Sequence, residues 1–136
     1  MKLGSYLRRQ SRRRSGFTLI EIMIVVMIIG LLAMIAIPNI NGALATSRYN
    51  AILNNLRVID NQKQLWAAEQ KKGDNDTPSE ADLAPYFGSG RFPASVMGET
   101  YNLNNVGTQP TATIPSRLKM PKQTFEAGGT VSLPEK

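Results

Sequence analysis

The chain has 136 residues, of which 42% are apolar and 19% are charged, and it contains neither histidine nor cysteine. Its length allows one small domain. Without His and Cys, the chain has no Cys/His zinc site, no cysteine nucleophile, no Ser-His-Asp triad and no disulfide.

The N-terminal segment carries the net charge of +6. Its basic residues are Lys2, Arg8, Arg9, Arg12, Arg13 and Arg14, and the first 16 residues contain no acid. The rest of the chain has equal numbers of basic and acidic residues and is therefore neutral. A neutral body gives no general reason to expect nucleic acid as a partner.

An almost uninterrupted apolar run follows, from Phe17 to Ile37, with Glu21 as its one charge. At about 1.5 Å per residue, a helix of this length spans roughly 30 Å, the thickness of a bilayer core. Because it is apolar on every side, it needs lipid or other protein around it. The preceding positive charges predict a single-pass inner-membrane protein with a cytoplasmic N-terminus and a periplasmic body.

Two alternatives concern export. Ser11–Arg13 loosely suggests a twin-arginine signal, and Ala43–Ala45 could be a small-residue cleavage site. However, the apolar run is longer than the roughly 7–15 residues of a cleaved signal core. The other alternative is an uncleaved signal anchor that holds a periplasm-facing binding module and never polymerises.

Glu21 is the residue that a plain anchor does not explain. A carboxylate near the bilayer centre costs about 2–4 kcal/mol, although this one lies only about 6 Å into the run. It could reach the interface or stabilise the first helical turn. Alternatively, cleavage between Gly16 and Phe17 would create an α-ammonium that neutralises Glu21 of its own helix or of a neighbouring one.

The sequence GFTLIE at residues 16–21, preceded by basic residues and followed by the apolar run to Pro38, resembles the class III signal of type IV pilins and type II secretion pseudopilins. The resemblance implies that prepilin peptidase cuts after Gly16 and methylates the new terminal Phe17. It also implies that Glu21 guides subunit docking and that the apolar helices form the core of a filament.

The same resemblance implies the partners. They are prepilin peptidase, copies of the chain itself, other pilin-like subunits, an assembly platform and a cytoplasmic ATPase. We expect no cofactor and no nucleic acid, and no enzymatic activity, because the sequence contains no GxSxG, Walker or Rossmann pattern.

Gly30 and Pro38 are the weak points of the predicted rod, since glycine and proline both destabilise a helix interior. Membrane helices tolerate both residues. The functional alternative, which the resemblance favours, is a stretch that bends or melts when the subunit leaves the lipid for the filament.

After Pro38 the pattern predicts an amphipathic continuation of the helix that runs to about Lys72 and stops at Gly73. Its stripe recurs in steps of four and three: Ala45, Tyr49, Ile52, Leu56, Ile59, Lys63 and Trp66. Every member except Lys63 is expected to bury apolar surface in a small core.

Residues 77–80 (TPSE) predict a capping box, with Thr77 as the cap and Pro78 at the first position of a short helix. Asp74 and Asp76 are weak calcium candidates in an acidic cluster with Glu80 and Asp82. Their spacing does not fit an EF-hand loop, so solvated turn and capping acids are the favoured interpretation.

The last part of the chain predicts a hairpin, with strands at 100–103 and 111–114 around a turn at 104–107. Pro110 and Pro115 restrict the second strand to a sheet edge or to a very short piece. The tail from Pro115 onward either adds a strand at 130–133 or is disordered. The segment also resembles pseudopilin heads with a cysteine on each side of the hairpin, where Ser95 and Ala112 stand here.

The predicted fold class is α+β, a long N-terminal helix packed against a small antiparallel sheet. The predicted segments are a leader (1–16), a transmembrane or filament-core helix (17–37), an amphipathic continuation (38–72) and a head (73–136). A DNA-uptake pilin is a further hypothesis and would need a basic face, for which the head offers only a few residues: Arg91, Arg117, Lys119 and Lys122.

Overall fold

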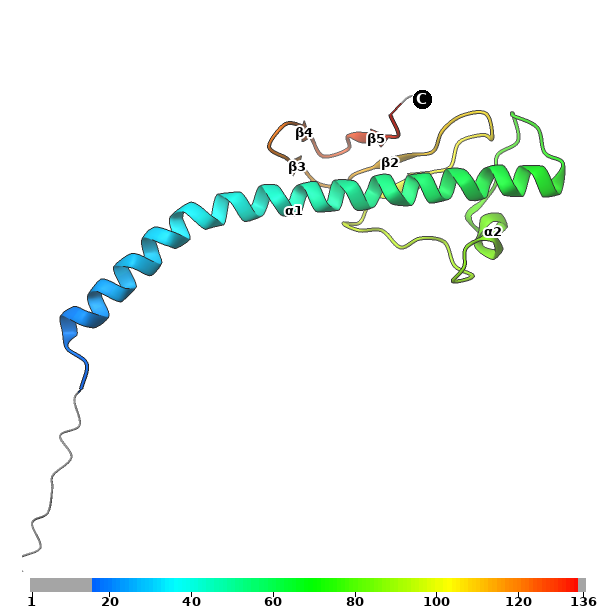
Figure 1. Cartoon of the computed structure of the whole chain (residues 1–136). Coiled ribbons are helices and arrows are strands. Elements are labelled where there is room, and N and C mark those ends of the chain that lie inside the picture. The colour runs from blue at the N-terminus through cyan, green and yellow to red at the C-terminus, as the bar shows by residue number, and fades with distance from the viewer. Residues whose placement is uncertain (1–15, 135–136) are drawn as a thin grey trace, which may run out of the picture. The chain divides into compact units, whose positions relative to one another are not determined.

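The computed structural model describes residues 16–134. Residues 1–15 of the basic leader, which include the Ser11–Arg13 motif, lie outside these residues. The described chain divides between Ile37 and Pro38 into two units. One helix, α1 (Leu19–Gln70), contributes to both (Figure 1).

The first unit is the apolar beginning of α1. Its large apolar side chains, from Phe17 to Ile37, are all between 50% and 84% exposed. The helix continues as α-helix through Gly30 and Pro38, the two predicted weak points. Since Pro38 has no N–H, the Met34 carbonyl lacks its helical partner.

In the second unit, α1 buries the predicted stripe. Ile52, Leu56 and Ile59 are fully buried, and Trp66 is nearly so. The periodicity therefore predicted the core-facing side of this helix correctly. Lys63 is the exception, because the structure buries it completely where the sequence suggested that it would stay out of the core.

Helix α1 ends at Gln70, two residues earlier than predicted. Lys71 has a φ of 52°, in the left-handed region, and the Lys72 N–H donates to the Ala67 carbonyl at 2.9 Å. This is the hydrogen bond of a Schellman cap, with a lysine where glycine is usual. Gly73 was the wrong stop signal because the chain had already turned.

The short helix α2 (Glu80–Leu83) also begins later than predicted. Its cap is Ser79, whose Oγ accepts from the Asp82 N–H at 3.2 Å, while an Asp82 carboxylate oxygen accepts from the Ser79 N–H at 2.9 Å. The capping box is therefore Ser79–Asp82, and the prediction of Thr77 as the cap was wrong. A 3₁₀ turn, η1 (Ala84–Tyr86), follows α2.

Three strands form the main antiparallel sheet, in the order β1 (Thr100–Asn102), β2 (Thr111–Thr113) and β5 (Thr130–Ser132). The register places the buried residues Tyr101, Ala112 and Val131 in one row across the sheet. This row joins the same core cluster as the α1 stripe. The α+β prediction is confirmed.

Strand β2 is very short, as its flanking prolines predicted, but it is the central strand and not an edge. Pro110 and Pro115 lie outside the paired residues, so neither removes a ladder hydrogen bond. Of the two alternatives for the tail, a strand or disorder, the structure contains the strand, β5. The tail also contains a small hairpin of β3 (Leu118–Lys119) and β4 (Thr124–Phe125).

The two candidate caps give a matched test. We expect Ser79→Ala to lower the free energy of unfolding by about 1 kcal/mol, because it removes the side-chain acceptor of the capping box. Thr77→Ala should leave it within about 0.5 kcal/mol of the wild type. Denaturant unfolding followed by the fluorescence of Trp66 measures both, and the reverse ranking would contradict the position of the cap.

Candidate functional site

The residues predicted for cleavage precede α1. Gly16, Phe17 and Thr18 adopt no regular secondary structure, and all three are exposed. The Phe17 side chain is 84% exposed. The peptide bond between Gly16 and Phe17 therefore lies in an accessible, non-helical part of the described chain.

Glu21 lies at the third position of α1 and completes a capping box. One of its carboxylate oxygens accepts from the Thr18 N–H at 2.7 Å, and the Thr18 hydroxyl accepts from the Glu21 N–H at 3.3 Å. The pair satisfies two main-chain donors that a helix start leaves without partners. The local role foreseen for Glu21, stabilising the first turn, is thus present in the structure.

The apolar segment that follows is suited to a membrane by length and composition. An 18-residue window of α1 has a mean hydropathy of 2.9, and none of that window is buried within the chain. A Cβ at Gly30 would meet no neighbouring atom within 4 Å. Within residues 16–37, the chain supplies no second element to cover this surface.

Asp74 and Asp76, the weak calcium candidates, accept hydrogen bonds from main-chain N–H groups. The Asp76 carboxylate accepts from the Gly73 N–H at 2.7 Å. The carbonyls of Asp74 and Asp76 accept from the N–H groups of Gly107 and Val106, each at 2.9 Å. The described residues contain no group of three or more His, Cys, Asp or Glu side chains that could hold a metal ion.

Gly107 lies at a junction where the two loops approach closely. A Cβ on it would lie 3.0 Å from the Asp74 Cβ. The loop 73–77 is therefore tied by main-chain hydrogen bonds to the loop between β1 and β2.

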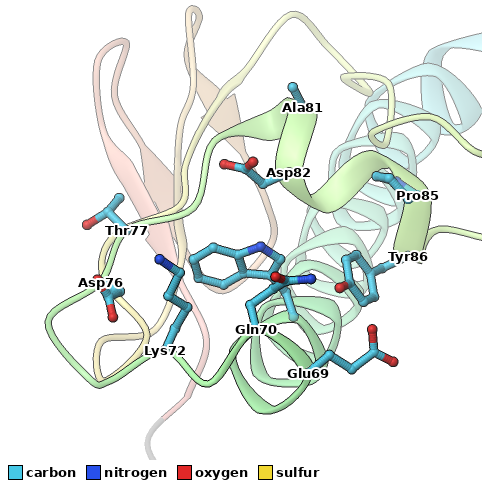
Figure 2. A pocket seen from close by; sticks show the side chains of 10 residues that line it. Glu69, Gln70, Lys72, Asp76, Thr77, Ala81, Asp82, Pro85 and Tyr86 are labelled. Carbon is cyan, nitrogen blue, oxygen red and sulfur yellow. The ribbon is translucent and has the colours of Figure 1, made fainter.

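A hollow of about 850 Å³ lies at the end of α1 (Figure 2). It is bordered by Trp66, whose ring lies 5.9 Å from the Lys72 ammonium, and by Tyr86. Its acids, Glu69, Asp76 and Asp82, come from three different elements, and two of them already accept local hydrogen bonds.

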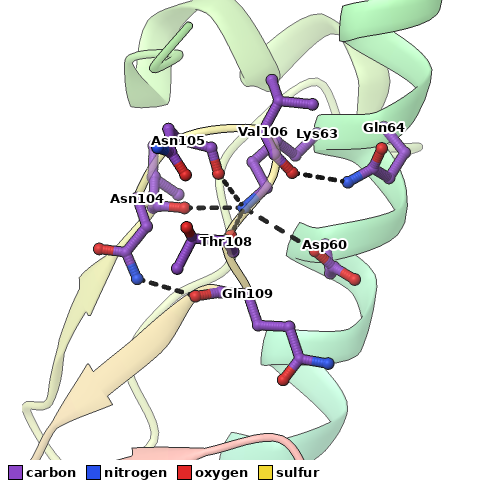
Figure 3. A network of polar contacts seen from close by, with 9 residues as sticks. Asp60, Lys63, Gln64, Asn104, Asn105, Val106, Thr108 and Gln109 are labelled. Atoms are coloured by element: carbon purple, nitrogen blue, oxygen red, sulfur yellow. Dashed lines mark hydrogen bonds and ion pairs between the residues drawn. The ribbon is translucent and has the colours of Figure 1, made fainter. Parts of the chain in front are cut away.

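Lys63 anchors the loop between β1 and β2 to α1 (Figure 3). Its ammonium donates to the carbonyls of Leu103 and Asn105, each at 3.0 Å, and of Thr108 at 2.5 Å. Burial lowers the pKa of Lys63, while the Asp60 carboxylate at 3.8 Å opposes this effect. The Gln64 side chain adds a hydrogen bond to the Val106 carbonyl at 3.0 Å.

A second polar network joins α1 to β1. The Asn55 amide donates to the Tyr101 hydroxyl at 2.8 Å, and this hydroxyl donates to the Glu99 carboxylate at 2.5 Å. Glu99, only 5% exposed, also accepts from the N–H groups of Val96 and Met97. Its carboxylate thus fixes the turn before β1.

Burial raises the pKa of Glu99, but the hydrogen bonds from Tyr101, Met97 and Val96 outweigh burial, so that the pKa lies below its ordinary value. Burial raises the pKa of Tyr101, and the neighbouring Glu99 adds to this effect. The Tyr101 hydroxyl therefore stays protonated and serves as a donor. Neither Lys63 nor Glu99 was predicted from the sequence as a residue that fixes the loops of the head.

The prokaryotic N-terminal methylation motif matches residues 11–37. The type II secretion system core protein G of Pseudomonas aeruginosa is 30% identical over 115 residues, which cover 74% of this chain and 80% of that protein. The chain belongs to the family of type IV pilins and type II secretion pseudopilins.

Other relatives of this pilin-like chain match over shorter stretches. The type IV major pilin protein PilA of Myxococcus xanthus is 40% identical over 81 residues, and core protein G of Aeromonas hydrophila is 30% identical over 63 residues. The match spans 36% of the Myxococcus protein and 44% of the Aeromonas protein. No solved structure matches the chain.

One of the basic residues considered for DNA binding is paired with an acid. Arg117 pairs with Glu126 at 3.2 Å on the surface. This pair reduces the positive charge of the β3–β4 hairpin, which also carries Lys119 and Lys122. The observed geometry therefore gives the DNA-uptake hypothesis no added support.

The Glu99 network predicts acid sensitivity of the head. Because the folded pKa is lowered, the stability that Glu99 contributes is complete above its ordinary value of 4.5 and is lost as the pH falls through the folded value. Glu99→Gln should weaken this acid dependence. It should also cost about 1–3 kcal/mol at neutral pH, because its NH₂ group faces main-chain donors.

Unfolding of the full chain in detergent, followed by Trp66 fluorescence at neutral and acid pH, measures this effect. Glu69→Gln, at an exposed position on α1, is the matched control and should keep the wild-type pH dependence. An unchanged acid dependence in Glu99→Gln would contradict the assignment.

Proposed function

We propose that the chain is a structural subunit of a pilus-like filament, processed after Gly16, methylated on Phe17 and assembled from the inner membrane. The observation that carries this proposal is the beginning of α1, an apolar helix that is exposed on all sides and has one acid at its start. The segment 17–37 would form the membrane and filament-core part, 38–72 the amphipathic continuation and 73–136 the head.

The apolar surface of this helix needs a dry environment on every side. A helix satisfies its own main-chain hydrogen bonds, so it can move between lipid and protein surroundings without breaking them. Each large apolar side chain that stays out of water gains about 1.5–3 kcal/mol. Neighbouring helices of the same kind would therefore replace the lipid once the subunit leaves the membrane.

Glu21 would set the register between subunits. Cleavage after Gly16 would place an α-ammonium on Phe17, next to the first turn of α1. The Thr18–Glu21 capping box holds the carboxylate at the helix start, where a positive chain end of a neighbouring subunit could reach it. The pairing would neutralise a charge that is costly in apolar surroundings.

Among filaments of this family, the type II secretion pseudopilus is favoured. The match to the Pseudomonas core protein G runs through 80% of that protein, whereas the match to the Myxococcus pilin spans 36% of it. By family resemblance, the partners would be prepilin peptidase, an assembly platform and a cytoplasmic ATPase. An energy source is needed because extraction from lipid exposes apolar surface.

The competing hypothesis is a signal-anchored module that does not polymerise. It explains the apolar helix but gives Glu21 only its capping role. Two substitutions separate the roles, because glutamine can still accept the Thr18 N–H in a capping box whereas alanine cannot.

We expect Glu21→Gln to abolish incorporation into filaments, with membrane insertion intact or improved, because it keeps the cap and removes the charge. Glu21→Ala should fail in the same way. The measurement is the amount of subunit in sheared filaments relative to the membrane fraction. Glu69→Gln is the matched control, and normal incorporation of Glu21→Gln would contradict the docking role of the Glu21 charge.

Intact mass of the membrane-extracted protein tests processing. We expect a chain that begins at Phe17 and is heavier by one methyl group, and we expect Gly16→Val to retain the leader because the peptidase cuts after glycine. A chain beginning at Thr46 would instead indicate export with cleavage after Ala45. A wild-type chain that keeps its leader in cells would contradict the proposed assembly.

A further inference from the structure

The loop between β1 and β2 directs several main-chain oxygens at a single point. The carbonyls of Leu103, Asn105 and Thr108 all accept from the Lys63 ammonium, at 2.5–3.0 Å (Figure 3). A primary ammonium has three N–H donors and no acceptor, so each proton has one carbonyl partner. The three N–H donors of the ammonium thus meet three carbonyls, of which the Asn105 carbonyl also accepts from the Thr108 N–H at 3.1 Å.

The loop is built independently of this ammonium on its other sides. The Asn104 amide donates to the Gln109 carbonyl at 2.8 Å, and the N–H groups of Val106 and Gly107 donate to the loop 73–77. These contacts hold the main chain in the shape that turns its carbonyls inward. Within residues 16–134, the buried side-chain oxygen without a hydrogen-bond partner, Asn105 Oδ1, also belongs to this loop.

The positive charge of Lys63 is buried and has an acid nearby. Lys63 is fully buried, and the carboxylate paired with its ammonium is Asp60, at 3.8 Å. This distance is too long for a hydrogen bond, so the three carbonyl dipoles supply the direct contacts. Without a cation, the buried Leu103 carbonyl and the Thr108 carbonyl would lose this donor, which is costly for the buried group, whereas the Asn105 carbonyl would keep the Thr108 N–H.

We propose that Leu103–Thr108 forms a carbonyl cage for a primary ammonium, which the chain fills with its own Lys63, and that the emptied cage binds external primary alkylammonium ions. The three acceptors suit an ammonium better than Ca²⁺, which takes six to eight oxygens at about 2.3–2.6 Å. A quaternary ammonium carries the charge but has no N–H to donate.

Lys63→Ala creates the empty cage. Alanine keeps Cβ and removes three methylene groups and the ammonium. The n-propylammonium ion has the same number of carbons and the same ammonium as the part removed. In the full chain in detergent, we expect Lys63→Ala to lower the unfolding midpoint by about 10 °C or more. At matched ionic strength, n-propylammonium should restore at least half of this loss with a saturable dependence on concentration.

Three controls define the specificity. Tetramethylammonium, sodium and calcium should restore little in Lys63→Ala. Lys63→Met, which fills the channel with an uncharged side chain, should not respond to n-propylammonium. Leu56→Ala, an apolar cavity on the same buried face of α1, should not respond either. Equal rescue by all ions, or rescue of Leu56→Ala, would overturn the proposal, and stronger rescue by calcium would assign the cage to a metal.

A second variant keeps the test valid if Lys63→Ala does not fold. The chain contains no cysteine, so Lys63→Cys can be alkylated in denaturant at one position only. Adding an aminoethyl group recreates a lysine-like primary ammonium, and adding a trimethylammonioethyl group supplies the charge without donors. We expect refolding to a near-wild-type midpoint with the first group alone. Equal refolding with both groups would show that charge suffices and would overturn the cage.

Discussion

The structure depends on a constraint on one helix: the first part of α1 must be dry on all sides, and residues 16–37 contain no second element to cover it. All large apolar side chains from Phe17 to Ile37 are exposed. A helix is the one element that can carry such a surface, because its main chain needs no outside hydrogen-bond partner. Lipid would cover this surface first, and in the proposed filament other subunits would replace the lipid.

The second part of α1 meets the opposite requirement, because one face must be covered by this chain alone. Ile52, Leu56 and Ile59 belong to the same apolar core as the sheet row through Ala112. Polar contacts then fix the loops, through Lys63 on one side and Asn55 with Tyr101 on the other. A head without disulfides is thus held by side chains that reach from one helix to main-chain groups far along the sequence.

The periodicity of α1 predicted its buried face because a helix repeats its contacts every three or four residues. The hairpin of β1 and β2 was predicted from the alternation of apolar and polar residues and from the turn residues between the strands. The cap of α2 could not be chosen from the sequence, since Thr77–Glu80 and Ser79–Asp82 both fit a capping box. Lys63 was misjudged because its carbonyl partners lie 40 or more residues away. Its position in the stripe between Ile59 and Trp66 was the available signal.

The two roles considered for Glu21 are compatible. In the isolated chain, the carboxylate accepts from the Thr18 N–H, which places the negative charge at the positive end of the helix. This arrangement lowers the cost of holding an acid at the beginning of an apolar segment. A carboxylate has two oxygens and about four acceptor positions, so one cap bond does not exhaust it. In the proposed filament, the cap would therefore persist while a neighbouring α-ammonium supplies the counter-charge. In the membrane, the cap within its own helix would lower the cost of the Glu21 charge. During assembly, the α-ammonium of a neighbouring subunit would pair with this charge and set the register.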